Sequence, residues 1–192
     1  MNNEYIDLLW SSLTKVEIWK RNTYSCKNYS EGISLIFEEF VRHKNKRTQL
    51  FFVGNGGSSA IASHMTADFM KNGGMNTCSL YDNAVITCMG NDYGYEYIFL
   101  KPLEFLLKED DLLVAISSSG NSQNIVNAID VANKKKASII TFTGFKPDNK
   151  VKQMGDINVY VPCEKYGIVE SIHNLILQQI VDMIMERDGV AI

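Results

Sequence analysis

The chain has 192 residues, of which 45% are hydrophobic and 21% charged, and its formal net charge is −3. This length suits one domain with a sizeable core, and the charge argues against an overall basic field that would recruit nucleic acid directly. No apolar run is long enough to span a membrane, and the N-terminus lacks a signal sequence. The four cysteines are scattered and form no CxxC pair, so we expect a cytoplasmic protein without a disulfide framework.

The first 45 residues predict two amphipathic helices. Apolar side chains recur at helical spacing over residues 2–22 and again from Ser30 to about His43. Both helices precede the first strand and have no strand partner of their own. We therefore expect their apolar faces to pack on the domain or on another subunit.

Strands and helices alternate through the rest of the chain. Apolar runs predict strands at 50–53, 77–81, 112–116, 137–142 and 157–161. Helical periodicity predicts helices at 57–71, 122–135 and 167–187, with helical pieces at 83–90 and 94–108. This alternation requires right-handed crossovers and a parallel sheet covered on both faces, and ligands of such sheets bind beyond the carboxyl ends of the strands.

Two strand ends are followed by loops suited to an anion. The strand at 50–53 is followed by Gly54-Asn55-Gly56-Gly57 and by Ser58, which can cap the next helix. The strand at 112–116 is followed by Ser117-Ser118-Ser119-Gly120-Asn121-Ser122. A helix that opens after such a loop directs backbone N–H groups and its dipole at a phosphate, although an ordinary turn or a solvated serine loop would have the same composition. The spacing is neither GxGxxG nor GxxxxGK[ST], so we expect no nucleotide cofactor.

A second group of polar residues lies on the predicted helices. His64 and Asp68 are four residues apart and share a helix face, roughly 10–15 Å along the axis from the glycine turn. Glu170, His173 and Gln178 lie in the apolar C-terminal helix and need polar partners there. These residues can border one cleft or hold a metal, but a surface ion pair and an interhelix hydrogen-bond network are the alternatives.

Four motifs in order resemble the sugar-isomerase (SIS) domain, and within it the phosphoheptose isomerase group. They are GNGGSSAIASH, MGNDYGYEYIF, ISSSGNSQNIVNAI and the IH pair of the C-terminal helix, spread over about residues 48–186. The resemblance implies a three-layer αβα sandwich whose five-stranded parallel sheet has the flavodoxin-like order, preceded by two N-terminal helices. Residues 1–192 would form one SIS domain, with residues 1–45 as a helical extension used in a homotetramer.

The resemblance also implies roles for individual residues. Asn55, Gly56, Gly57 and Ser58 would line the sugar site together with the Asn91-Asp92 pair, and Ser117, Ser118, Ser119 and Ser122 would clamp the phosphate. His64 corresponds to a zinc ligand of the family. The chain departs from the family at three positions, with Asp68 in place of glutamate, Glu170 in place of glutamine and Gln178 in place of histidine. It also has Ile168 where the family has arginine.

These departures leave two hypotheses. In the first, the chain is an aldose–ketose isomerase that converts sedoheptulose 7-phosphate to D-glycero-D-manno-heptose 7-phosphate for surface polysaccharide. Asp68, Glu170 and Gln178 would then form the catalytic group, and His64, Asp68, Glu170 and Gln178 would hold zinc. Gln178 cannot titrate, so a base at that position would be lost. In the second hypothesis, the chain is an altered or inactive SIS protein that binds phosphosugars as a sensor or serves as an adaptor, for instance for a replication initiator.

Overall fold

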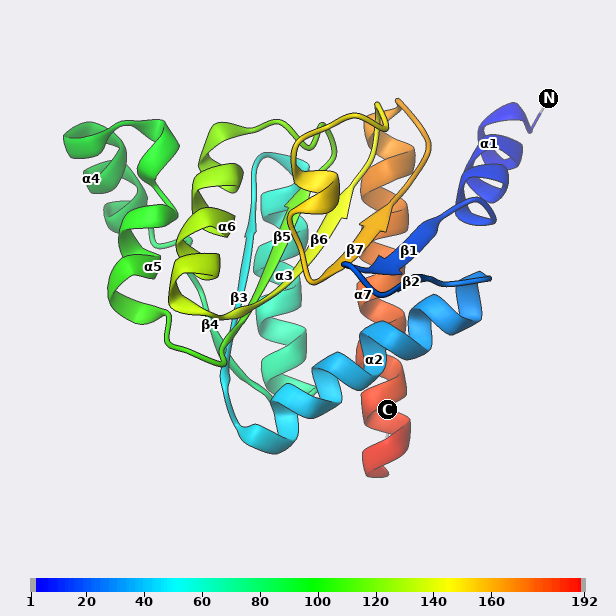
Figure 1. The fold of residues 1–192 in the computed structure, drawn as a ribbon, viewed down its shortest axis with the longest axis horizontal. Coiled ribbons are helices and arrows are strands. Elements are labelled where there is room, and N and C mark those ends of the chain that lie inside the picture. Colours follow the sequence, from blue (N-terminus) through cyan, green and yellow to red (C-terminus); the bar gives the residue numbers. More distant parts are fainter. Residues whose placement is uncertain (1–2, 191–192) are drawn as a thin grey trace.

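The computed structural model describes residues 3–190 of the chain. Its helices are α1 (Glu4–Leu13), α2 (Tyr29–Lys46), α3 (Gly57–Lys71), α4 (Asn83–Tyr93), α5 (Leu100–Leu106), α6 (Gln123–Lys135) and α7 (Tyr166–Asp188). Its strands are β1 (Glu17–Lys20), β2 (Tyr24–Ser25), β3 (Gln49–Gly54), β4 (Asn76–Cys78), β5 (Leu112–Ser117), β6 (Ser138–Thr143) and β7 (Ile157–Tyr160). Two short 3₁₀ turns, Tyr95–Tyr97 and Val151–Gln153, complete the order (Figure 1). Residues 1, 2, 191 and 192 of the predicted domain lie outside the described residues.

The strands form one sheet in the order β2-β1-β7-β6-β5-β3-β4. The strands from β7 to β4 pair in parallel, and this part has the predicted flavodoxin-like order. The prediction of a sheet with only five parallel strands nevertheless missed two further strands. Strand β1 pairs antiparallel with β7, and β2 pairs antiparallel with β1, so the sheet has seven strands and is mixed.

The two strands were missed because a single helix was predicted over residues 2–22, and that prediction is wrong beyond Leu13. Helix α1 ends at Leu13, and the chain then turns into β1. Ile18 in β1 is only 3% exposed, and the strand is aligned with β7 from Glu17 opposite Tyr160 to Lys20 opposite Ile157. The open edge of β7 thus satisfies backbone groups that a helix would have satisfied internally, so a distant pairing overrides the local helical pattern. Residue 2 of the predicted helix lies outside the described part.

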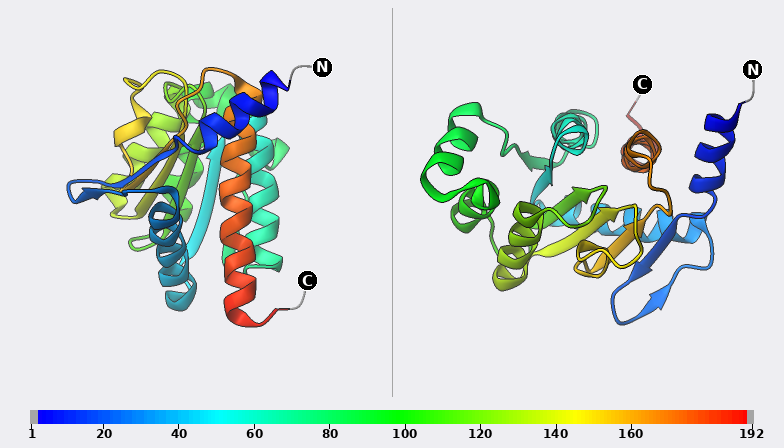
Figure 2. Two further views of the ribbon diagram at one scale, coloured as in Figure 1. Left: turned by 90° about the vertical axis from the view of Figure 1, so that its right-hand side faces the viewer. Right: turned by 90° about the horizontal axis from the view of Figure 1, so that it is seen from above.

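Helices cover both faces of the sheet, as Figures 1 and 2 show. Along β3, Leu50 and Phe52 face one helical layer, while Phe51 and Val53 face the other, as the two-residue period of a strand requires. The first layer contains α2, α3 and α7, and the second contains α5 and α6. This arrangement is the predicted three-layer sandwich. No helix within residues 3–190 is long and apolar enough to cross a membrane.

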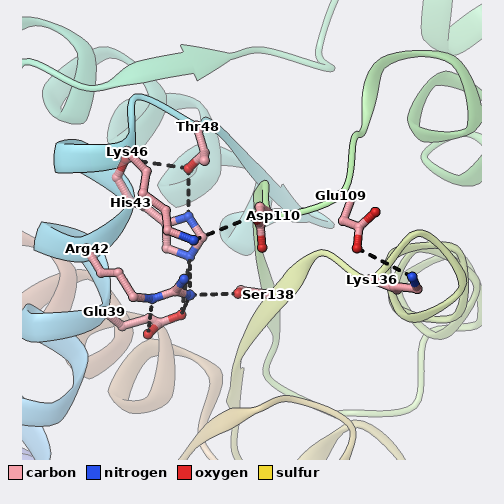
Figure 3. Close-up of polar contacts among 9 residues, drawn as sticks. All are labelled: Glu39, Arg42, His43, Lys46, Thr48, Glu109, Asp110, Lys136 and Ser138. Carbon is pink, nitrogen blue, oxygen red and sulfur yellow. Dashed lines mark hydrogen bonds and ion pairs between the residues drawn. The ribbon is translucent and has the colours of Figure 1, made fainter.

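A partly buried polar network links α2 to the amino ends of the strands (Figure 3). His43 is fully buried, its Nδ1 lies 2.7 Å from the Thr48 hydroxyl, and its Nε2 lies 3.2 Å from a carboxylate oxygen of Glu39. Arg42 donates to Glu39 and, over 2.9 Å, to the Ser138 hydroxyl at the start of β6. Burial alone would raise the pKa of Glu39, but its hydrogen bonds with His43 and Arg42 and the Arg42 charge lower it to about 2. This edge of the sheet is opposite the edge where we expected ligands.

Candidate active site

The glycine turn and the serine loop meet at the carboxyl edge of the sheet. Strand β3 ends at Gly54, which is paired with Ile116 of the neighbouring parallel strand β5. The glycine turn leads directly into α3, and the serine loop leads into α6. Because β3 and β5 are adjacent and parallel, the loops that follow them lie side by side.

A cavity of about 340 Å³ lies between these two loops and the start of α7. Its lining residues are Asn55, Gly56, Gly57, Ser58, Ser117, Ser118, Ser119, Ser122, Tyr166 and Glu170. The sequence had singled out all of these except Tyr166, which lies one residue before the predicted start of the last helix. Tyr166 is exposed, and its ring contacts Phe145 edge-on, 4.6 Å between centroids. No local pattern around Tyr166 indicated a role in a site.

Of the residues that the structure describes, the cavity lining contains no cationic side chain, yet its hydroxyl and backbone N–H groups suit a phosphate. The serine loop contributes four serines, and the start of α3 contributes Ser58 and backbone N–H groups at a helix end, where such groups ordinarily lack partners inside the helix. Ser118 is 4% exposed, and its buried hydroxyl has no hydrogen-bond partner among the described residues. Buried polar atoms in native proteins nearly always have a partner, so an orphaned hydroxyl beside a cavity points to a ligand.

The glycine turn is held in place by side chains that the sequence analysis did not identify. The Tyr81 hydroxyl contacts both the backbone N–H and the carbonyl of Gly54, at 2.7 and 2.9 Å. The Asn55 side chain exchanges two hydrogen bonds with buried Asn124, at 2.9 and 2.8 Å, and accepts a third from the Tyr95 hydroxyl at 3.0 Å. The turn is therefore rigid before any ligand binds, and the Asn55 side chain serves to hold the loop.

Glu170 brings a carboxyl group into the cavity. It lies one turn into α7, and its carboxyl group packs against the backbone of Gly57, where a Cβ atom would be only 2.2 Å from Oε2. Partial burial raises the pKa of this carboxyl above its ordinary value. A carboxylate with a raised pKa is a stronger base, which is what proton abstraction from carbon needs.

His64, Asp68 and Gln178 form a separate group, which we call the α3–α7 cluster. The Gln178 amide nitrogen donates to Asp68 Oδ2 over 2.6 Å and lies 3.0 Å from His64 Nε2, and the imidazole lies 3.3 Å from the same carboxylate. Glu170 precedes Gln178 by two turns of helix, about 12 Å along the axis, and contacts Gly57 instead. The four residues of the predicted zinc set are therefore divided between two places.

The α3–α7 cluster does not fit a zinc site. It offers one imidazole and one carboxylate, whereas zinc in proteins takes three or four ligands drawn mainly from His, Cys, Asp and Glu. Nowhere in the described part of the chain do three such side chains converge as a metal-holding group.

The structure does not place Asn91 and Asp92 in the lining of the cavity. Both lie exposed near the end of α4, where the Asn91 amide donates to Asp92 over 2.9 Å and the Cys88 thiol lies 3.6 Å from the same carboxylate. Ile168, at the family's arginine position, is fully buried in the core. Both regions therefore depart from the pattern that the resemblance implied.

The fold, with its two loops at the carboxyl edge of the sheet, defines an α/β domain of the SIS type. Residues 27–144 match the SIS domain family, and the chain belongs to that family. Among its curated relatives is the phosphoheptose isomerase of Aliarcobacter butzleri, 34% identical over 151 residues, which cover 76% of this chain and 78% of the relative. The solved phosphoheptose isomerase from Francisella tularensis superposes with a TM-score of 0.74 at 30% identity, covering 80% of this chain and 84% of that one. The phosphoheptose isomerase from Neisseria gonorrhoeae also gives 0.74, at 29% identity, with coverage of 79% and 84%.

Proposed function

We propose that the chain is a phosphoheptose isomerase that interconverts sedoheptulose 7-phosphate and D-glycero-D-manno-heptose 7-phosphate. Its relatives support this reaction, and the unpartnered hydroxyl of Ser118 is the single observation that carries the phosphate site. The serine loop and the start of α3 bind the phosphate through hydroxyl and backbone N–H groups. The sugar then extends past the glycine turn toward α7.

Glu170 acts as the base that moves the proton between carbons. Its carboxylate removes the proton from the carbon beside the carbonyl, which gives an enediol, and returns it to the neighbouring carbon. A hydroxyl proton passes to the former carbonyl oxygen in the same sequence, so the reaction needs no oxidant or reductant. Glu170 is suited to this role because it lines the cavity and because its pKa is raised. Asp68 and Gln178, which we also expected to be catalytic, bond to each other outside that lining.

Assembly and location are part of the same proposal. Helix α1 exposes Tyr5, Ile6 and Trp10, at 52%, 57% and 67%, and an apolar face of this kind is suited to contact with further copies of the chain in a homotetramer. All four cysteines are free thiols, which suits the reducing cytoplasm. There the product would supply heptose for surface polysaccharide.

The test is an isomerase assay with sedoheptulose 7-phosphate on the wild type and on Glu170→Gln. Loss of the base should lower kcat by roughly 10²-fold or more while calorimetry shows the substrate still bound. Glu164→Gln, a change at an exposed carboxylate just before α7, is the matched control and should keep full turnover.

The alternative is a phosphosugar-binding protein without turnover, and the amide of Gln178 in place of a titratable group favours it. Binding of sedoheptulose 7-phosphate by the wild type without any product would assign the chain to that class. Absence of both binding and turnover would contradict both functions.

A further inference from the structure

The α3–α7 cluster lies where two parallel helices that build the cavity pack together. Helix α3 carries Gly57 and Ser58 at its start, and α7 carries Tyr166 and Glu170 at its start. About two turns further along both helices, His64 and Asp68 of α3 face Gln178 of α7. A hydrogen bond at this point therefore links the two helices whose starts line the cavity.

The Gln178 amide contacts Asp68 Oδ2 and His64 Nε2, the two atoms whose lone pairs a metal ion would need. The amide nitrogen donates to Asp68 Oδ2 over 2.6 Å and lies 3.0 Å from His64 Nε2, which accepts from it when the imidazole carries its proton on Nδ1. A primary amide has two N–H donors, one for each of these two atoms. The side chain of Asp68 is only 19% exposed, so the hydrogen bond that the Gln178 amide donates to its carboxylate is largely shielded from water.

We propose that the α3–α7 cluster is a metal-free clamp, in which the Gln178 amide replaces a metal ion as the bridge between the two helices. The amide neutralises no charge but donates to both acceptors at once, which closes the gap between the helices without a cation. The claim concerns metal content and helix packing, so it does not depend on turnover or on the identity of the substrate.

The same geometry predicts that one substitution converts the clamp into a metal site. Gln178→His would place a second imidazole opposite His64 and Asp68 and so supply about three strong ligands, the number found in open zinc sites. Gln179→His is the matched control, because the Gln179 side chain is directed elsewhere and accepts from the Tyr29 hydroxyl over 2.9 Å. Its new imidazole would lie about 100° around the helix from position 178.

The experiment titrates zinc into the chelator-treated full chain by calorimetry, with metal content checked by mass spectrometry. We expect no stoichiometric zinc on the wild type or on Gln179→His, and about one zinc per chain on Gln178→His. The thermal midpoint of the wild type should be the same with and without chelator. Stoichiometric zinc on the wild type, or a midpoint that falls with chelator, would overturn the proposal without any variant. Equal zinc uptake by the two histidine variants would overturn the assigned geometry.

Discussion

Replacement of Gly57 by alanine should separate catalysis from stability. A Cβ atom at this position would lie 2.2 Å from Glu170 Oε2, 2.5 Å from Cδ and 2.6 Å from Oε1. An ordinary contact needs at least 3.4 Å, so the carboxyl group must retreat by about 1.2 Å. The atoms that must move are the end of a flexible side chain, and the backbone can stay where it is.

The two expected effects differ greatly in size. A misplacement of about 1 Å at a reacting group costs on the order of 10²-fold in rate, so kcat of Gly57→Ala should fall by about that factor. The free energy of unfolding should stay within about 1 kcal/mol of the wild type, because alanine is a better helix former than glycine. Isomerase kinetics and urea denaturation measure the two quantities on the same preparation.

Gly56, the residue before Gly57, provides a contrasting substitution. Gly56 has a φ of 53° and a ψ of −122°, with no described atom within 4 Å of a Cβ, so Gly56→Ala should destabilise the fold by roughly 1–3 kcal/mol through backbone strain alone. If Gly57→Ala keeps its kcat within about twofold of the wild type, the position of the Glu170 carboxyl does not limit the reaction. The base would then have to be sought elsewhere.

Four further predictions concern the phosphate site, the acid stability and the assembly. Ser118→Ala should weaken sugar-phosphate binding in calorimetry at no cost in stability, because its buried hydroxyl has no protein partner to lose; unchanged affinity would reject the cradle. Burial lowers the pKa of His173 from 6.5 to about 4, so between these pH values the imidazole is protonated in the unfolded chain but not in the folded one. The free energy of unfolding should therefore fall as the pH is lowered from 6.5 to about 4. His173→Gln should remove this pH dependence from denaturation curves. The pKa of Glu39 is about 2 in the folded chain and 4.5 for an ordinary glutamate, so its contribution to stability is present above pH 4.5 and lost as the pH falls toward 2. Glu39→Gln should lower the free energy of unfolding at neutral pH by on the order of 3 kcal/mol. Trp10→Glu on exposed α1 should reduce the mass found by light scattering, and an unchanged mass would exclude α1 from the interface.

The elements around the cavity could be predicted because their signals are local. The run at 50–53 followed by Gly54-Asn55-Gly56-Gly57, and the run at 112–116 followed by serines, each contain a strand, its end and the start of a helix within a few residues. A parallel sheet then brings both loops to the same edge. The eight loop residues chosen from the sequence all line the cavity.

The remaining features depend on contacts between distant segments. Trp19 fits the helical pattern predicted over residues 2–22, yet Glu17–Lys20 form a strand because β7 offers them an open edge. Nothing near Tyr81, Tyr95 or Asn124 shows that they hold the glycine turn, since each acts across the fold. For the same reason, the sequence placed Glu170 with His64 in one ligand set, although its carboxyl group lies against Gly57.

The most direct measurement is proton NMR of sedoheptulose 7-phosphate incubated with the full-length protein in D₂O. A base that shuttles a proton between adjacent carbons exchanges part of it with solvent, so deuterium should enter at the carbons that react as the aldoheptose phosphate forms. Glu170→Gln should slow deuterium incorporation and product formation together, by roughly 10²-fold or more, while still binding the substrate. Product and deuterium at the wild-type rate in Glu170→Gln, or neither in the wild type, would contradict proton transfer by Glu170 in this cavity.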